Sequence, residues 1–455
     1  MRQMLSIQGS WSNRWIFILA AMGSSVGLGN IWLFPVMTGQ HGGGAFILLY
    51  LSCMLLVAVP IMMAEVVIGR HARQNPVNAI EDAAVSAGAS RHWRLVGALA
   101  IFCGFLIFSY YSVVAGWVLH YLVAMIFGQL NGLGVDQTSR FFNKLLADSQ
   151  MLLLWHSLFV LLVIWVLAQR VERGLDRAMR FLMPVLFLML FMLLGFALTT
   201  GEFVSATEYL FNFHLQDIGW DAVLIALGHS FFTLALGVGV IMAYSAYMGK
   251  SDSIAPTVIA IGVFDTLVAL LIGLVVVTVV MAAQMELRAG PGLLFVTLPV
   301  AFLQLPGGQV FGFLFFLLAA VAALTSAISL LEPATAWVTE RFKWSRARAV
   351  LLLGALAWGL GVAALYSLGQ LSDLKILGVS IFDLIDITTT ILFLPLGGIA
   401  VAVLAGWVLD KELLTAELAL SNPAMAALWL WLLRFVAPAA VGLIFVMNLY
   451  NALYS

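Results

Sequence analysis

At residues 23–30 the chain has the sequence GSSVGLGN, which interrupts the first of its long apolar runs, residues 14–38. Three glycines and a cluster of polar side chains weaken an α-helix at this point. In a bilayer, unwound backbone leaves N–H and C=O groups unpaired at several kcal/mol each, unless the protein or a ligand pairs with them. We therefore interpret residues 23–30 as a break in a membrane helix that contributes to a binding site.

The composition places the chain in a membrane. Of its 455 residues, 63% are hydrophobic and 9% are charged, and the mean hydropathy is +1.07. Ordinary soluble domains carry about 25% charged residues. The formal net charge of -1 leaves no basic surface for a nucleic acid. The two cysteines, Cys53 and Cys103, form neither a disulfide framework nor a zinc-binding pattern.

Eleven apolar runs are long enough to cross a bilayer as helices, since a crossing needs roughly 20 residues. They occupy residues 14–38, 44–69, 95–128, 150–169, 178–200, 220–248, 254–284, 308–338, 347–368, 376–408 and 425–453. The runs are continuously apolar, whereas the strands of a membrane barrel would alternate. The sequence therefore predicts an all-α membrane protein. The first run is too long for a signal peptide, and the loops are too short for a separate core, so residues 1–455 are expected to form a single transmembrane domain.

Loop charges set the expected orientation, because cytoplasmic loops carry an excess of Lys and Arg. With the N-terminus inside, sixteen Lys and Arg residues fall in inner segments. The four in outer segments are Arg140, Lys144, Arg288 and Lys375. We therefore expect a multi-pass protein of the inner (plasma) membrane, with its N-terminus in the cytoplasm and its C-terminus outside.

A second interruption, with the sequence GHSFFTLALGVG, occupies residues 228–239 in the sixth apolar run. The first and the sixth apolar runs each begin a set of five runs. Interrupted helices at matching positions of two such sets are typical of transporters built from inverted repeats. The repeats would span residues 14–200 and 220–408, with an extra helix at 425–453. For one run alone, glycines that allow close helix packing are an equal alternative. Two matching interruptions favour a shared binding site at the middle of the membrane.

Several further motifs are shared with a known family. They are VGLGNIW at 26–32, FP at 34–35, GGGAF at 42–46, Glu65, GR at 69–70, YY at 110–111, FFTL at 231–234 and ALTSA at 323–327. Through them nearly the whole chain resembles the bacterial amino-acid branch of the neurotransmitter:sodium symporter family, which has a leucine-transporter-like fold. The resemblance implies sodium-coupled uptake of an amino acid by alternating access, in which a bundle carrying the first and sixth spans rocks against the other spans.

The resemblance also implies two sodium sites, built from the oxygen ligands that a hard cation prefers. The first, shared with the substrate, would use the Ser25 carbonyl and the side chains of Asn30, Thr233 and Asp265. The second would use the carbonyls of Gly23, Val26 and Ala322 and the hydroxyls of Thr325 and Ser326.

Asp265 stands in an apolar run, where a carboxylate is costly and usually functional. Many family members have a neutral amide at this place and recruit chloride, whereas a built-in carboxylate supplies the negative charge itself. We therefore predict that chloride is not required. The alternative is a protonated or paired carboxyl with a structural role.

Gly27 indicates the substrate class. Monoamine carriers of the family have an aspartate at this place, whereas glycine leaves room for a substrate carboxylate. The resemblance places that carboxylate on N–H groups near Gly27 and Gly29, on the Tyr111 hydroxyl and on the shared sodium ion. The amine would meet carbonyls of the unwound segments. The residues expected to bind substrate are Ser25, Gly27, Gly29, Ile107, Tyr111, Phe231, Phe232, Thr233, Ala235, Val238, Ser326 and Leu330.

Four of these residues would surround the side chain of the substrate: Ile107, Ala235, Val238 and Leu330. Because all four are apolar, we expect a hydrophobic L-amino acid, with an aliphatic side chain favoured over an aromatic one. Phe232 would lie over the substrate. Taken singly, each of these residues also fits ordinary core packing.

Three places depart from the family pattern, one of them Gln8, which stands where an arginine near the N-terminus is usual. Leu33 replaces the usual arginine of the outer gate, although the partner aspartate is retained as Asp386. His229 replaces a glutamine, and it would either respond to pH or bond locally as a neutral ring. On the inner side, Tyr247 and Glu340 match the family pattern.

Two other function classes fit parts of the sequence. Residues 23–27 match the G-x-S-x-G signature of serine hydrolases, with His229 as a base, but that signature needs a strand-turn-helix context. We therefore do not expect an enzyme. No phosphate loop or zinc motif is present, so ATP-driven pumping has no support either. A sensor that binds an amino acid without moving it would share every motif. The sequence leaves this alternative and the oligomeric state open.

Overall fold

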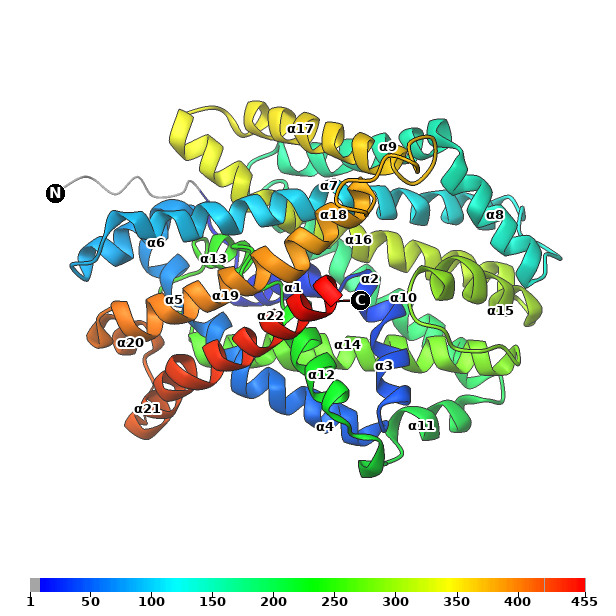
Figure 1. Cartoon of the computed structure of the whole chain (residues 1–455), viewed down its shortest axis with the longest axis horizontal. Helices are drawn as coiled ribbons and strands as arrows, with labels where there is room; N and C mark the ends of the chain where they lie inside the picture. The colour runs from blue at the N-terminus through cyan, green and yellow to red at the C-terminus, as the bar shows by residue number, and fades with distance from the viewer. Residues whose placement is uncertain (1–8, 421, 455) are drawn as a thin grey trace.

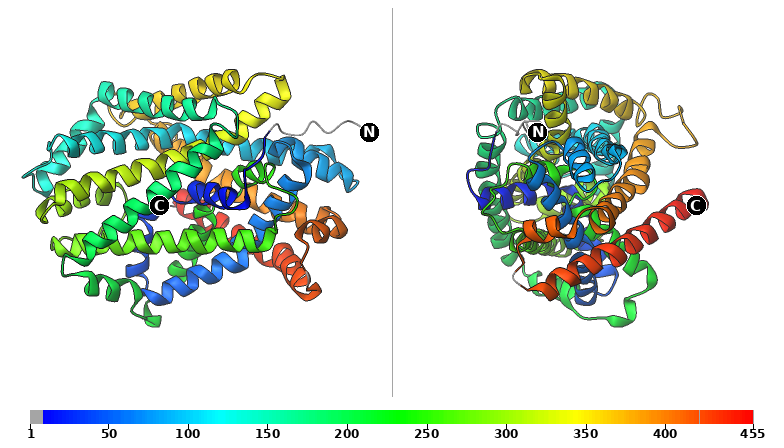
Figure 2. Two further views of the ribbon diagram at one scale, coloured as in Figure 1. Left: turned by 180° about the vertical axis from the view of Figure 1, so that it is seen from behind. Right: turned by 90° about the vertical axis from the view of Figure 1, so that its left-hand side faces the viewer.

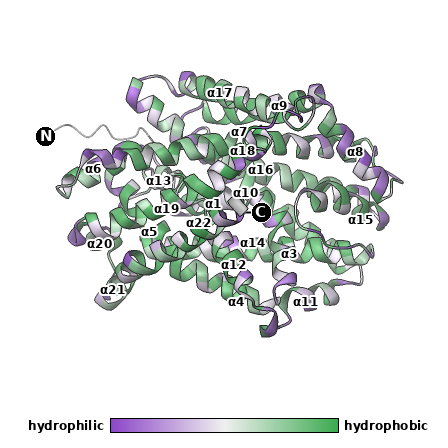
Figure 3. Ribbon diagram, in the orientation of Figure 1, coloured by the Kyte–Doolittle hydropathy of each residue, from purple (hydrophilic) through white to green (hydrophobic). Residues whose placement is uncertain are grey.

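The computed structural model describes residues 9–420 and 422–454, and over these residues the protein is helical without a β-strand. Most of the long helices run lengthwise through the molecule (Figure 1, and from behind in Figure 2). Hydrophobic residues dominate their middle parts, and hydrophilic residues gather toward the two ends (Figure 3). A bundle that meets lipid at its middle and water at both ends has this distribution. The predicted fold class is confirmed.

The helices, with η marking π-helical and 3-10 segments, have these bounds: α1 Arg14–Ser25, α2 Leu28–Trp32, α3 Phe34–Gln40, α4 Gly44–Cys53, η1 Met54–Ala58, α5 Val59–Ala72, α6 Pro76–Ser86, η2 Arg91–Trp93, α7 Arg94–Ile126, α8 Val135–Ala147, α9 Ser149–Leu167, α10 Leu175–Leu198, α11 Phe203–Phe211, η3 Leu215–Asp217, α12 Trp220–Thr233, α13 Val240–Ser245, α14 Ile254–Ala282, η4 Leu293–Thr297, α15 Leu298–Gln304, α16 Gly308–Phe342, α17 Arg346–Tyr366, α18 Ile381–Ile387, η5 Thr388–Phe393, α19 Leu394–Val403, η6 Leu404–Val408, α20 Lys411–Leu418, α21 Pro423–Trp431, η7 Leu432–Val436 and α22 Ala437–Tyr454.

Within residues 9–420 and 422–454, nine continuous helical segments are long and apolar enough to cross a membrane. The pair Arg14–Ser25 and Leu28–Gln40, bent by 60° at its break, makes a tenth. The sixth predicted span, 220–248, is divided into α12 and α13, which are each too short to count, so helix length does not confirm eleven crossings. The tenth predicted span begins at Ile381 rather than at residue 376, because the chain forms a turn before it.

The first break lies inside the predicted stretch 23–30. α1 ends at Ser25, and Val26 and Gly27 have extended backbone, with φ and ψ of -72° and 94° and of -125° and -169°. The helix resumes at Leu28. Only these two residues leave the helical conformation, so the break is sharp and the chain turns through it.

The second break comprises residues 234–239, between α12 and α13. Ala235, Gly237 and Gly239 have φ values of 50°, 77° and 74°. Glycine adopts this left-handed conformation without penalty, whereas an alanine rarely does. The Gly237 N–H donates to the buried Glu65 carboxylate of α5 at 2.8 Å. α5 thus supplies a partner for backbone that the bilayer would leave unpaired.

The two breaks lie inside the bundle. α1 packs against α10, α13, α14 and α16, and most of its residues are buried. α13 packs against α5 and α16. The unwound segments are therefore enclosed by protein and do not face lipid, which is the condition under which such backbone is tolerated at membrane depth.

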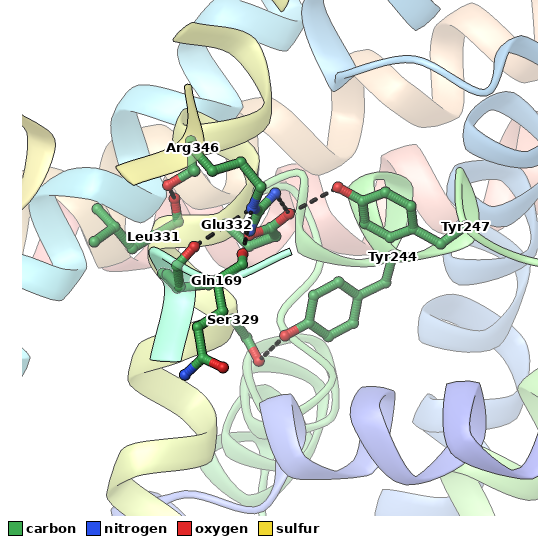
Figure 4. Close-up of polar contacts among 9 residues, drawn as sticks. Gln169, Tyr244, Tyr247, Ser329, Leu331, Glu332 and Arg346 are labelled. Carbon is green, nitrogen blue, oxygen red and sulfur yellow. Dashed lines mark hydrogen bonds and ion pairs between the residues drawn. The ribbon is translucent and has the colours of Figure 1, made fainter. Parts of the chain in front are cut away.

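A buried ion pair joins α16 to α17 near the ends that the loop charges predict to be cytoplasmic (Figure 4). The Arg346 guanidinium donates to both oxygens of Glu332, with N–O distances of 3.0 and 2.6 Å. The Tyr247 hydroxyl donates to the same carboxylate at 2.7 Å, and Arg346 also donates to the Gln169 carbonyl at 3.1 Å. The Glu332 side chain is fully buried.

Glu332→Gln is expected to destabilise the protein by about 3 kcal/mol, because removing one member of a buried ion pair leaves the other charge uncompensated. The measurement is the Tm of the purified full chain. Glu286→Gln is the matched control, since Glu286 pairs with Arg288 where both side chains are more than three-quarters exposed and such pairs contribute little. Equal Tm values for the two variants would contradict the expectation.

A second ionic contact ties α20 to the end of α5. The Glu417 carboxylate accepts from His71 Nδ1 at 3.1 Å and from Arg70 Nε at 2.9 Å. Arg70 also donates to the Glu417 carbonyl. The hydrogen bond from His71 and the contacts with Arg70 hold the pKa of Glu417 below its ordinary value.

This lowered pKa predicts an acid-sensitive contribution to stability. A carboxyl whose pKa is lower in the folded state stabilises the protein above its unfolded-state pKa, about 4.3, and the contribution is lost as pH falls through the folded value. We expect the Tm difference between the wild type and Glu417→Gln to be present at pH 6 and to shrink steadily as the pH falls below about 4.3. A difference that grows on acidification would contradict the sign.

Candidate functional site

Three polar side chains from different helices meet beside the two breaks. Asn30 of α2, Thr233 at the end of α12 and Asp265 of α14 are all buried. The Thr233 hydroxyl lies 3.2 Å from Asn30 Oδ1 and 3.1 Å from Asp265 Oδ2, and Asn30 Nδ2 donates to Asp265 Oδ1 at 3.2 Å. These are three of the four residues expected at the first sodium site. Their convergent oxygens fit a hard cation, which prefers neutral and anionic oxygen ligands.

Ser25, the fourth expected ligand, is the last residue of α1. Its hydroxyl donates to the Ala21 carbonyl at 3.0 Å, so the side chain is used within its own helix. Its carbonyl lies beside Gly27, 4.0 Å from the position that a Cβ of that residue would take. A serine nucleophile would need a base, and this hydroxyl is instead paired with backbone.

A second cluster contains all five residues expected at the other sodium site. The Ser326 hydroxyl lies 3.2 Å from the Gly23 carbonyl and 3.3 Å from the Val26 carbonyl, so it joins α16 to the end of α1. The Thr325 hydroxyl lies 3.0 Å from the Ala322 carbonyl. Helical hydroxyls often bond back in this way without any ligand. The Ser326 hydroxyl differs from the Thr325 hydroxyl, because it contacts two carbonyls of another helix at the point where that helix breaks.

A tyrosine hydroxyl lies next to Gly27. The Tyr111 hydroxyl of α7 is buried and makes no close hydrogen bond, and the polar groups that interact with it are the Ser326 hydroxyl and the Leu28 backbone N–H. A Cβ at Gly27 would lie 3.6 Å from this atom and 3.4 Å from the Ser326 hydroxyl. Buried hydroxyls nearly always have close partners, so the Tyr111 hydroxyl is able to donate to a polar group that comes from outside the chain.

The apolar residues expected around the substrate come from three elements. Val238 of the second break and Leu330 of α16 both approach Gly104 of α7, one helical turn before Ile107. Ile107, Val238 and Leu330 are buried. Ala235, in the same break as Val238, is partly buried.

The two phenylalanines at the end of α12 point in different directions. Phe232 is 41% exposed, and its ring lies 4.0 Å from the position of a Gly29 Cβ, so it lies beside the first break. Phe231 is buried and packs so closely against Gly398 of α19 that a side chain there would clash with its ring. Both phenylalanines were expected to bind substrate, but only Phe232 lies beside the first break.

Two of the departures from the family pattern have structural counterparts, and the third, Gln8, lies outside the described residues. Asp386, which lacks an arginine partner because of Leu33, interacts with the Tyr110 hydroxyl. His229 is buried between Phe34 and Tyr50, at ring-centroid distances of 5.4 and 5.7 Å, and its Nε2 atom has no partner. One of the two expectations for His229 was a local hydrogen bond made by a neutral ring, and the Nε2 atom does not make such a bond.

At the end of the bundle that the loop charges predict to be cytoplasmic, Glu340 accepts from the side chain and the backbone N–H of Asn75, with N–O distances of 2.6 and 3.2 Å. Glu65 is the residue whose contact the motifs did not predict. A carboxylate inside an apolar run is usually functional, and this signal could have linked Glu65 to the second break.

The chain matches the model of the sodium:neurotransmitter symporter family over residues 8–138 and 142–454. The chain belongs to this family. The family transports solutes with sodium, so this member is a sodium-dependent transporter and not an enzyme. The resemblance of the motifs is thereby confirmed.

Known proteins agree with the family assignment. An uncharacterized sodium-dependent transporter of Bacillus subtilis, YhdH, is 34% identical over 97% of this chain and 98% of its own length. A second, from Haemophilus influenzae, is 30% identical over 97% of this chain and 98% of its own length. The crystal structure of MhsT in complex with L-phenylalanine is 37% identical and covers 97% of this symporter and 100% of its own chain, with a TM-score of 0.87.

Proposed function

We propose that this symporter takes up a hydrophobic L-amino acid together with sodium by alternating access. The residues for substrate and ions are those set out above, with repeats at 14–200 and 220–408 and an additional helix at 425–453. The protein would lie in the inner membrane with its N-terminus in the cytoplasm.

The observation that carries the proposal is the buried Tyr111 hydroxyl beside Gly27, which makes no close hydrogen bond within the protein. An amino-acid carboxylate would accept a hydrogen bond from this hydroxyl and from N–H groups at the start of α2, where the helix dipole favours an anion. It would also contact the sodium ion held by Asn30, Thr233 and Asp265.

The apolar surroundings support the substrate class. Ile107, Val238 and Leu330 offer no polar group to a substrate side chain, so a polar side chain there would lose its hydrogen bonds to water. MhsT, which is similar over the whole chain, was crystallised with L-phenylalanine. Both observations favour a hydrophobic amino acid, and an aliphatic preference remains our prediction.

The second cluster suggests how sodium binding is coupled to movement. A cation between the carbonyls of Gly23 and Val26 and the hydroxyls of Thr325 and Ser326 would hold α1 against α16. Loss of the ion would release α1, and with it the inner end of the pathway. The built-in charge of Asp265 would make chloride unnecessary at the first site.

Binding of each of the twenty amino acids to the purified protein, with sodium or with choline in its place, tests the proposal. We expect sodium-dependent binding of hydrophobic amino acids only. Tyr111→Phe should weaken that binding about tenfold or more, because a hydrogen bond to a charged group is lost. Tyr121→Phe is the matched control, since it removes another buried, unpaired hydroxyl from α7.

Equal effects of the two tyrosine variants would contradict the assigned role of Tyr111. A sensor would bind the same ligands, so transport needs its own measurement. Counterflow of labelled substrate into vesicles containing the purified protein should occur, and binding without counterflow would favour the sensor.

A further inference from the structure

Two π-helical segments face each other on the outer surface of the bundle. η7, Leu432–Val436, lies in the last span, and η6, Leu404–Val408, ends the preceding one. α19 and α22, which continue these segments, lie side by side in Figure 1. π-Helical turns are rare and occur frequently at functional sites. η7 also contains Arg434, a cation within a membrane-spanning helix.

Arg434 is held in place by its neighbours. Its Nε atom donates to the Gly406 carbonyl, its guanidinium lies 5.7 Å from the centre of the Trp407 ring, and Trp407 Nε1 donates to the Arg434 carbonyl at 3.3 Å. A Cβ at Gly406 would lie 3.1 Å from Arg434 Cγ, so the glycine makes room for the arginine. The side chain is thus positioned by contacts and is not left to extend freely toward water.

The charge of Arg434 is not balanced by the protein. Among residues 9–420 and 422–454, no carboxylate lies within ion-pair distance of Arg434, and its two terminal nitrogens have no hydrogen-bond partner. A cation in a membrane-spanning helix is costly unless an anion or water compensates it. Four N–H groups are therefore available for an anionic ligand that comes from outside the chain.

The surroundings of Arg434 are those of a membrane interface. Trp407, Trp431 and Phe435 are each at least half exposed, and tryptophan is enriched where hydrocarbon meets head groups. Gly406 and Trp407 lie within two residues of the end of their span at Val408, an end that the loop charges place on the cytoplasmic side. At this depth the bilayer itself provides phosphate groups, and those of the cytoplasmic leaflet include anionic lipids.

We propose that Arg434, with Trp407 and Trp431, forms a binding site for the head group of an anionic phospholipid between the last two spans. The phosphate would accept from the terminal N–H groups of Arg434, a geometry that suits a guanidinium fork. The exposed indoles would pack against the glycerol and the upper acyl chains. The lipid then bridges η6 and η7 and stabilises the contact of the two spans.

Native mass spectrometry of the purified full chain with equal amounts of phosphatidylglycerol and phosphatidylcholine tests the site. We expect the wild type to retain phosphatidylglycerol preferentially, and Arg434→Gln to retain about fivefold less. The Tm should rise more with phosphatidylglycerol than with phosphatidylcholine for the wild type, and equally with both for Arg434→Gln. Arg348→Gln is the matched control, because Arg348 is an exposed arginine near the predicted inner surface whose side chain has no partner in the described residues.

Three outcomes would overturn the proposal. One is an unchanged lipid preference in Arg434→Gln, and another is an equal loss in Arg348→Gln. The third is a change of oligomeric mass in Arg434→Gln without added lipid, which would assign the surface to a second copy of the chain. Inorganic phosphate at millimolar concentration should not reproduce the Tm rise, because the site needs the acyl chains as well as the anion.

Discussion

Asp265→Asn is expected to lower sodium-dependent uptake in chloride-free buffer on the order of a hundredfold or more. Asp265 is fully buried and is the only anion among the three side chains that meet at the first cluster. A carboxylate 4 Å or less from a cation contributes about 4 kcal/mol at an effective dielectric constant of about 20, and a neutral amide removes most of it. The measurement is uptake of labelled amino acid into proteoliposomes at varied sodium concentration.

The proposed role of the Asp265 charge leads to a second prediction for Asp265→Asn, which concerns chloride. If the carboxylate replaces an anion from solution, chloride should restore part of the lost transport in the variant and should not affect the wild type. Asp217→Asn, in an exposed segment that the loop charges predict to lie outside, is the control for loss of a carboxylate elsewhere. Transport by Asp265→Asn that matches the wild type and ignores chloride would show that the carboxylate has only a structural role.

The combined variant Thr325→Ala with Ser326→Ala is expected to abolish sodium-dependent uptake. Both hydroxyls are buried, and that of Ser326 contacts the two carbonyls at the end of α1. Removing them takes away two proposed ligands and the direct contact between α16 and the first break. A cation that keeps only three carbonyl ligands would bind too weakly to hold α1 in place.

Thr335→Ala gives the matched control for this double variant. Its hydroxyl is buried on the same helix and donates to the Leu331 carbonyl at 2.9 Å, four residues earlier. Thr335→Ala should therefore keep the sodium dependence of uptake. The expectation is contradicted if the double variant retains the wild-type sodium dependence, or if Thr335→Ala loses it as well.

Much of the fold could be predicted because lipid imposes a simple rule on composition. Continuous apolar runs predicted the intact spans with small errors at their ends, such as the start at Ile381. Glycine and polar residues within two runs predicted the breaks. The length of each break could not be predicted, because only Val26 and Gly27 leave the helix in the first, whereas six residues, 234–239, leave it in the second.

The candidate site was predictable in part because its residue types are unusual inside a membrane. Asn30, Thr233 and Asp265 stand out in apolar runs, and the structure brings their side chains within hydrogen-bond distance. Phe231 and Phe232 are identical in type and adjacent. Their different directions, one toward Gly398 and one beside Gly29, follow from the way α12 ends and from what packs against it.

The amino-acid sequence by itself determined that lipid surrounds this protein, that two of its helices are interrupted, and which motifs place it among sodium symporters. These properties follow from local composition, since each depends on residues close together in the chain. Only the tertiary structure decided which groups meet at the breaks: Glu65 with Gly237, Ser326 with Gly23 and Val26, and Tyr111 with Gly27. These contacts join residues up to about 300 positions apart, and such pairings depend on how the helices pack together in three dimensions.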